Sequence, residues 1–281
     1  MAENGNGKVD LQELGLAVGL VFGRHLFAVQ DLHYGYWTPD LEPHITNLAR
    51  AQEQYSDLLI ANLAHGARTI LDVGCGIGRL AERLVERGYE VECVSPSPFL
   101  TQFARERLAD RVVFHPCRFE ELQTEKRFDV VLCSESFQYL QLEPALAKSL
   151  ELLHPGGQLL IADFFKTGKP GRSPISGGHR LRDFYAAVSK LPMEVLCDLD
   201  ITPQTAPTMQ LVNDLFMNAG RPAWEMSMYA LHNRHPWVSR VLWWTLGRKL
   251  AKLEQKHLRG ERTPENFKHF KSYRLLAFRR A

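Results

Sequence analysis

The chain has 281 residues, of which 45% are hydrophobic and 23% charged, and its formal net charge is +2. These values exclude a disordered or collagen-like chain and leave room for one large or two small domains with a sizeable core. The five cysteines form no Cys-x-x-Cys pair, which argues against a disulfide scaffold and fits buried thiols in a reducing cytoplasm. We find no metal-ligand spacing, so no bound metal is expected.

An apolar stretch opens the chain. Residues 10–29 are interrupted by charged residues such as Glu13 and Arg24 and lack a basic leader region, so they fall short of a signal peptide or a membrane span. We expect a helix here that caps a pocket or lies on a surface.

Aromatic residues then surround a glycine at 33–37, and this pattern predicts a turn with buried rings. A helix is expected at 48–63.

A strand, a glycine turn and a helix follow one another at 69–88. Residues 69–73 are apolar, Gly74, Gly76 and Gly78 occupy alternate positions, and apolar residues at helical spacing come next. Glycines let a ligand approach the backbone, and a helix N-terminus offers unpaired N–H donors. The spacing differs from the Gly-x-Gly-x-x-Gly of dinucleotide-binding folds. A nucleotide-like ligand is expected, and a turn that binds nothing is the alternative.

The letters D-V-G-C-G-I-G at 72–78 closely resemble the first motif of class I methyltransferases, which use S-adenosyl-L-methionine (SAM). The resemblance implies a Rossmann-like α/β fold with a seven-stranded, mostly parallel sheet, an antiparallel last strand at the sheet edge, and a helical lid and insert. It also implies SAM as cofactor and S-adenosyl-L-homocysteine (SAH) as product. In that family the acid at the position of Asp72 meets the ammonium group of the methionine moiety. The turn residues assigned to the cofactor in this way are Gly74, Cys75, Gly76 and Gly78.

The letters H-Y-G-Y-W at 33–37 resemble the N-terminal lid of the tocopherol, sarcosine/dimethylglycine and sugar O-methyltransferase-like group. In that group the aromatic rings close over the methionine end of SAM. The resemblance therefore assigns Tyr36 and Trp37 to the cofactor and makes His33 a hypothesis for proton handling or acceptor orientation. Packing of these rings without a ligand is the alternative.

The ribose position departs from the common family pattern. Most relatives place an acid after the second strand, here 89–94, to bind both ribose hydroxyls, whereas Ser95, Pro96 and Ser97 stand there as in the tocopherol and cyclopropane-synthase relatives. We assign these three residues to the ribose. One hydroxyl cannot accept two hydrogen bonds as a carboxylate does, so this contact is weaker than the family norm.

The adenine position departs from the pattern as well. After the third strand, 111–114, Arg118 and Phe119 stand where relatives usually carry the acid that receives the adenine amino group. An arginine can stack on adenine but cannot accept that hydrogen bond, and Phe119 can offer its backbone amide. Both are cofactor candidates, and an exposed Arg118 is the alternative.

The fourth strand, 128–133, leads into residues that we expect beside the ligand, because ligands in open α/β sheets lie beyond the carboxyl ends of the strands. Ser134 and Glu135 are cofactor candidates, and Glu135 and Tyr139 are also hypotheses for proton handling. The segment resembles the E-S-G-E-H of the tocopherol group. Gln138 and Tyr139 replace its last two residues, which argues against a carboxylate/imidazole pair as general base.

The second half of the chain supplies the remaining core elements and a loop. Residues 166–178, rich in Gly, Pro and basic side chains, are expected to form a substrate lid. His179, beside this lid, is a candidate base, and a structural role is the alternative. The other expected elements are a helix at 143–153, a strand at 158–165 after a Pro-Gly-Gly that resembles the family's L-x-P-G-G, a helix at 179–191, a strand at 193–201 and a last strand at 271–278.

Residues 204–260 are rich in large apolar side chains, at the place where Rossmann-like methyltransferases insert helices over the acceptor pocket. Within them, 237–259 combines an apolar stripe with basic residues, a pattern typical of an amphipathic helix at an anionic membrane surface. A solvated basic face over a packed apolar face is the alternative. The apolar stripe consists of Val238, Leu242, Leu246, Leu250 and Leu253, and the basic residues are Arg240, Arg248, Lys252 and Lys256.

We therefore predict a cytoplasmic SAM-dependent methyltransferase that acts on a small, lipophilic acceptor and makes peripheral membrane contact through 237–259. O-, N- and C-methylation all stay open. No nucleic-acid partner is expected, because the chain has no RNA-binding module and no N-P-P-Y-type motif. The predicted organisation is a helical lid at 1–65, a SAM-binding core at 66–203, a helical acceptor-pocket insert at 204–262 and the final core strand at 263–281.

Two alternative functions are weighed against this one. A non-catalytic SAM- or SAH-binding protein is suggested by Ser95 and Arg118 in place of the usual acids. A lipid modifier similar to cyclopropane synthases is suggested by the serine-proline segment at 95–98, although Gln138 and Tyr139 fit that function less well.

Overall fold

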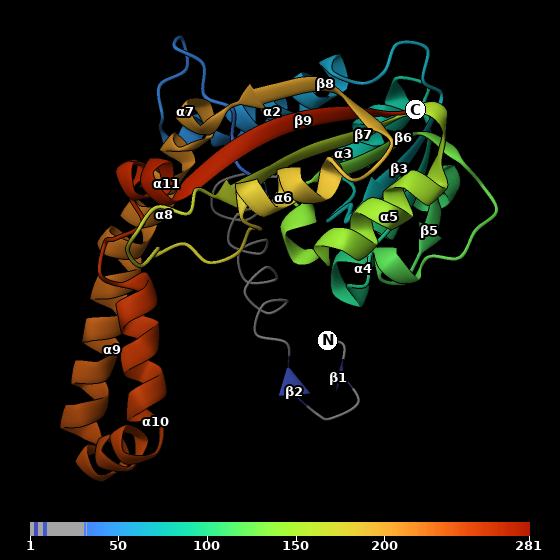
Figure 1. Ribbon diagram of the computed structural model, residues 1–281. Coiled ribbons are helices and arrows are strands. Elements are labelled where there is room, and N and C mark those ends of the chain that lie inside the picture. Colours follow the sequence, from blue (N-terminus) through green and yellow to red (C-terminus); the bar gives the residue numbers. More distant parts are fainter. Residues whose placement is uncertain (1–2, 5–7, 10–30, 32) are drawn as a thin grey trace.

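A seven-stranded sheet forms the centre of the computed structural model, which describes residues 3–4, 8–9, 31 and 33–281 (Figure 1). The strand order is β5-β4-β3-β6-β7-β9-β8, and all neighbouring pairs are parallel except those that β9 makes with β7 and β8. This topology confirms the predicted fold class. The strands are β3 (Thr69–Val73), β4 (Glu90–Val94), β5 (Val113–His115), β6 (Phe128–Ser134), β7 (Leu153–Lys166), β8 (Met193–Asp200) and β9 (Lys271–Arg280); apart from this sheet, β1 (Glu3–Asn4) pairs with β2 (Lys8–Val9).

The position predicted for the last strand is wrong. β9 does not lie at the sheet edge but between β7 and β8, and β8 forms the edge. Leu275 and Leu276, which point to opposite faces of β9, are both completely buried, so this strand needs cover on both faces. In β8, Glu194 and Asp198 are exposed and pair with arginines of β9, as suits an edge strand.

Helices cover both faces of the sheet in three layers. Ile70 and Val130 belong to the buried cluster beneath α2 and α3, whereas their neighbours Leu71 and Val131 belong to the cluster beneath α5 and α6. Burial of one such side chain contributes about 1.5–3 kcal/mol, so this alternation fixes which face each strand presents. The helices are α2 (Leu48–Ala61), α3 (Arg79–Glu86), α4 (Pro98–Leu108), α5 (Leu142–Leu152), α6 (Leu181–Val188), α7 (Thr202–Thr205), α8 (Pro207–Leu215), α9 (Arg221–Arg234), α10 (Pro236–His257) and α11 (Pro264–Phe270).

Helices α9 and α10 extend away from the sheet as an antiparallel pair (Figure 1). A single π-helical turn, Phe216–Gly220, joins α8 to α9 without a break. The predicted division at 65, 203 and 262, including the role of an acceptor-pocket insert, stays a prediction. The apolar segment 10–29 lies outside the described residues. Within the described part of the chain, none of the helices has the length and apolar character required to span a bilayer.

The turn between β3 and α3 depends on two crowded glycines. Gly74 has φ +74° and Gly78 has φ +78°. A Cβ on Gly74 would lie 2.5 Å from Cβ of Ser136, and one on Gly78 would lie 3.1 Å from Cβ of Ala104 in α4. Both positions therefore combine a left-handed backbone with a lack of space, and only glycine satisfies both conditions.

We expect Gly78→Ala to lower the free energy of unfolding by about 1–3 kcal/mol more than Gly88→Ala does, because crowding adds to the backbone cost. Gly88 is the matched control: its φ is +86°, and nothing lies within 4 Å of the added Cβ. Urea unfolding of the ligand-free variants measures both values. Equal losses would contradict the packing argument.

Candidate functional site

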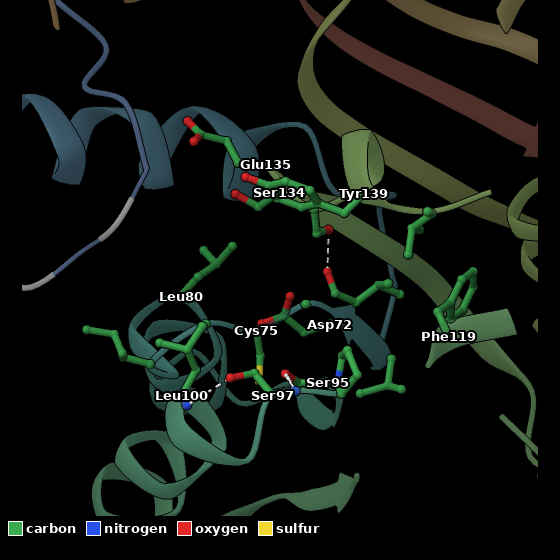
Figure 2. A pocket seen from close by; sticks show the side chains of 18 of the residues that line it. Asp72, Cys75, Leu80, Ser95, Ser97, Leu100, Phe119, Ser134, Glu135 and Tyr139 are labelled. Atoms are coloured by element: carbon green, nitrogen blue, oxygen red, sulfur yellow. Dashed lines mark hydrogen bonds between the residues drawn. The ribbon is translucent and has the colours of Figure 1, made fainter. Parts of the chain in front are cut away.

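A cavity of about 600 Å³ lies beyond the carboxyl ends of β3, β4 and β6, where the chain changes direction across the sheet. Such a crevice is the usual ligand position in open α/β sheets, and its volume suits a small molecule. Figure 2 shows Ser134, Glu135 and Tyr139 on one side of Asp72, with Ser95 and Ser97 on the other.

Asp72 is the last but one residue of β3 and is 1% exposed. Its Oδ2 has no hydrogen-bond partner among the described residues. Burial raises the pKa of this carboxyl to about 7, because the charged form loses its hydration. A buried carboxylate oxygen without a partner in the described chain, at the wall of a cavity, is suited to a cationic ligand.

The glycine turn forms the floor beside Asp72. The Gly74 N–H donates to the carbonyl of Val94 in β4 at 2.8 Å, which ties the turn to the neighbouring strand. Gly76 has φ +55° and lines the cavity, and a Cβ added there would meet nothing within 4 Å. The turn therefore presents bare backbone, with space above it, to whatever fills the cavity.

The residues predicted for the ribose lie at the end of β4. Ser95 is buried, and its Oγ accepts a hydrogen bond from the Ser97 N–H at 3.3 Å. The Ser97 hydroxyl accepts from the Leu100 N–H at 3.2 Å and so caps α4. Ser95, Pro96 and Ser97 all line the cavity. The hydroxyls of Ser95 and Ser97 thus accept backbone hydrogen bonds in the turn, and both residues also line the cavity.

Three consecutive residues that follow β5, the neighbour of β4, extend this part of the cavity wall. Arg118 is exposed, Phe119 is buried, and Glu120 is half-buried with its Oε1 accepting a hydrogen bond from the Gln141 N–H at 2.7 Å. All of them line the cavity. Sequence reasoning looked for a carboxylate at 118 and found arginine, whereas the structure brings the carboxylate of Glu120 to the same wall.

Glu135 stands at the end of β6 in a left-handed conformation, with φ +52°. Its Oε1 accepts hydrogen bonds from the Tyr34 N–H at 2.6 Å and the Tyr273 hydroxyl at 2.7 Å. The Tyr273 hydroxyl also lies 2.9 Å from that of Tyr55. Burial raises the pKa of Glu135, although the charge of His33 and these two donors oppose the shift. Such backbone strain at a non-glycine residue is held by its surroundings and is common at functional sites.

His33 lies beside this network. Its ring stacks on Tyr55 with 4.5 Å between centroids, and its Nε2 lies 3.5 Å from Oδ1 of Asp31. Burial lowers the pKa of His33, but the charge and hydrogen bond of Asp31, the charge of Glu135 and the hydrogen bond to the Tyr34 carbonyl together raise it above its usual value. The structure therefore brings His33 and Glu135, two of the predicted proton-handling residues, to one end of the cavity.

Four predicted site residues do not line the cavity. The Trp37 ring is buried and donates from Nε1 to the Thr208 hydroxyl at 2.9 Å, and Tyr36 is half-buried against the core. Gly78 lies behind the turn. His179 precedes α6 and faces the carbonyl of Phe137 through Nε2 at 3.2 Å. Residues that sequence reasoning did not assign but that line the cavity include Asp31, Arg79, Glu120, Ser136 and Gln141.

Among the described residues of the cavity wall, acidic side chains outnumber arginines. The wall includes the carboxyl groups of Asp31, Asp72, Glu120 and Glu135, whereas the arginines are Arg118, which is exposed, and Arg79, which pairs with Glu82 at 2.8 Å. The arrangement favours a ligand that carries positive charge. Of the acids that the sequence left without a role, Asp31 lies two residues before the predicted aromatic lid at 33–37 and Glu120 directly follows Phe119. Their closeness in the chain to residues already assigned to the site is the sequence feature that could have identified them.

Comparison with known proteins fits this geometry. Residues 70–157 match the family described as a methyltransferase domain. An uncharacterized methyltransferase from Geobacillus kaustophilus is 31% identical over 161 residues, which are 53% of this chain and 74% of that protein. The chain belongs to the class I SAM-dependent methyltransferases. It is therefore a methyltransferase, the activity that the resemblance of the motif at 72–78 implied.

Two solved structures share the fold of this methyltransferase. The [4+2]-cyclase SpnF has a TM-score of 0.70 at 21% identity, covering 96% of this chain and 94% of that one. A geranyl diphosphate C-methyltransferase from Streptomyces coelicolor A3(2), solved with Mg²⁺, geranyl diphosphate and SAH, has a TM-score of 0.64 at 17% identity, covering 97% and 99%. At these identities the likeness concerns the Rossmann-like fold alone.

We expect Tyr273→Phe to lower the free energy of unfolding by about 1.5–3 kcal/mol, because it removes a buried donor to the Glu135 carboxyl. Tyr185→Phe is the matched control. It removes a hydroxyl that donates to Asp198 at 2.7 Å at a partly exposed site, where water replaces the bond, and we expect a loss below about 1 kcal/mol. Urea unfolding measures both, and a smaller loss in Tyr273→Phe than in the control would overturn the expectation.

Proposed function

We propose that the methyltransferase binds SAM in the cavity between β3, β4 and β6, with Asp72 against the ammonium group of the methionine moiety. The observation that carries the proposal is the buried Asp72 Oδ2, which has no partner among the described residues. The open space above Gly76 supports it, because the ligand can approach that backbone. The negative wall of the cavity suits both positive groups of SAM, the ammonium and the sulfonium.

We propose that the nucleoside lies across the ends of β4 and β5. Ser95 and Ser97 would face the ribose, with Pro96 between them. Phe119 would offer its backbone amide and Arg118 its guanidinium plane to the adenine. Glu120 would accept the hydrogen bond from the adenine amino group that Arg118 cannot accept. The position of Glu120 on the cavity wall supports this assignment.

We propose that Glu135 and His33 handle the acceptor. SAM supplies an activated methyl group, so the protein mainly needs to hold the acceptor in line and close, which is worth up to about 7–11 kcal/mol. The raised pKa of Glu135 and its fixed position suit it to take a proton where the acceptor carries one. Tyr139, also on the cavity wall, would orient the acceptor. The roles assigned to Tyr36, Trp37, Gly78 and His179 stay predictions, and none of these residues lines the cavity.

We propose that the acceptor is lipophilic and reaches a cytoplasmic enzyme that touches the membrane through 237–259. A fold neighbour was solved with geranyl diphosphate, a molecule with a long apolar part. The many large apolar side chains of 204–262 support the same class of acceptor. No nucleic-acid partner is proposed.

Labelled methyl transfer tests the function. We expect the purified enzyme, given methyl-labelled SAM and an extract of its host, to place label in the organic-solvent fraction. Asp72→Asn should reduce this labelling at least about tenfold, because a neutral amide replaces the carboxylate beside the ammonium group of SAM. Labelling of protein or RNA would contradict the acceptor class, and SAH binding without any labelling would favour a non-catalytic binding protein.

Affinity for SAH should depend on pH through Asp72. Its pKa of about 7 means that the carboxyl is protonated below pH 7, and a protonated carboxyl does not attract an ammonium group. We expect the affinity to fall about tenfold from pH 8 to pH 6 as the proton has to be displaced. Calorimetry at both pH values measures this change, with Asp72→Asn as the control that should show none. A wild-type affinity that stays constant would remove Asp72 from the cofactor site.

A further inference from the structure

We define the two-helix arm as α9 and α10 together (221–257). Among the described residues, its two helices pack mainly against each other along most of their length. None of its described side chains belongs to the buried clusters around the sheet. Trp224 and Met228 of α9, and Leu242 and Leu250 of α10, are half-buried. These residues recur at helical spacing and form the inner faces of the pair. Apolar side chains outside these inner faces therefore have no cover within the described chain.

The outer face of α10 carries large apolar side chains. Trp237 is 70% exposed, Val241 51% and Trp244 86%. Their spacing of four and then three residues places them on one side of the helix. On α9, Met226 and Tyr229 are 69% and 74% exposed. The arm thus has a second apolar surface, distinct from the stripe that faces its partner helix.

Charge on the arm is strongly positive. Residues 221–257 contain seven Lys or Arg and two Glu. Arg248 follows Trp244 by four residues and continues the same line, Arg240 flanks it, and both are exposed. Two copies of this face would bring like charges together, which opposes self-association. The charge therefore favours an anionic occupant.

We propose that the outer face of α10 in the two-helix arm binds the surface of an anionic lipid bilayer. Tryptophan side chains concentrate at the level of lipid headgroups, and arginines bind phosphate groups. An apolar centre with basic residues around it is the arrangement of interfacial helices, which lie about 5–10 Å deep. A nucleic acid would need the positive charge but not the central Trp237, Val241 and Trp244.

The arm is joined through α8 to the segment that contacts Glu135 at the cavity wall. Because α8 continues into α9 through the π-helical turn, the arm extends the helix that contacts the predicted lid. In α8 the Thr208 hydroxyl accepts from the Gly35 N–H at 3.1 Å, and the Met209 sulfur accepts from the Tyr34 hydroxyl at 3.7 Å. Tyr34 in turn donates to Glu135. Lipid contact would hold this end of the enzyme near a membrane-dissolved acceptor, a consequence that rests on the proposed function.

Vesicle sedimentation of the full chain, without SAM or acceptor, tests the lipid contact. We expect binding to vesicles of phosphatidylcholine with phosphatidylglycerol, weaker binding to phosphatidylcholine alone, and loss of binding at high salt. The double variant Trp237→Ser/Trp244→Ser should bind at least about tenfold more weakly. Arg240→Glu/Arg248→Glu should lose the preference for phosphatidylglycerol.

Matched variants separate this surface from general effects. Leu196→Ser/Leu199→Ser changes two exposed apolar residues of β8, and Arg182→Glu reverses an exposed charge on α6; neither should alter binding. No binding by wild type, or equal binding by the Trp237/Trp244 variant, would overturn the proposal. Oligomers in lipid-free solution that this variant dissociates would assign the face to a second copy instead. SAH calorimetry on each variant tests the cofactor site separately.

Discussion

Ser136 occupies the space that a side chain on Gly74 would need. The turn after β3 and the loop after β6 therefore pack directly against each other. This close approach brings the ends of two adjacent parallel strands together at the point where the chain changes direction across the sheet. Asp72 and Glu135 consequently face one cavity from two strands. Because the turn also begins α3, a shift here would move the helix and the cavity wall together.

Burial without charge pairing dominates the electrostatics of this cavity. Asp72 and Glu135 both have raised pKa values, because each is removed from water and neither forms an ion pair with a lysine or arginine of the described chain. Exposed charges behave differently: Asp198 pairs with Arg274 at the edge of the sheet. The cavity wall therefore contains two buried carboxyl groups with no lysine or arginine partner among the described residues.

The position of β9 links the sheet to the part of the cavity that Glu135 lines. Since β9 lies inside the sheet, Tyr273 reaches Glu135 and Tyr55 at the same time. A strand at the sheet edge would have left Glu135 with the Tyr34 N–H as its donor. The strained backbone of Glu135 is thus held by contacts from Tyr34 and from Tyr273 of the last strand, whose hydroxyl also bonds Tyr55 of α2.

Local sequence was sufficient to predict the strand, glycine turn and helix at 69–86, because the spacing of a few neighbouring residues determines such a unit. The same residues were sufficient to indicate the family to which the chain belongs. It also placed Ser95, Phe119, Ser134 and Glu135 after strands, and these residues do line the cavity. Only the tertiary structure decided that β9 pairs with both β7 and β8, that Glu120 stands on the cavity wall, and that Trp237 and Trp244 face outward. Strand pairing and burial join residues far apart in the chain, so no local pattern contains them.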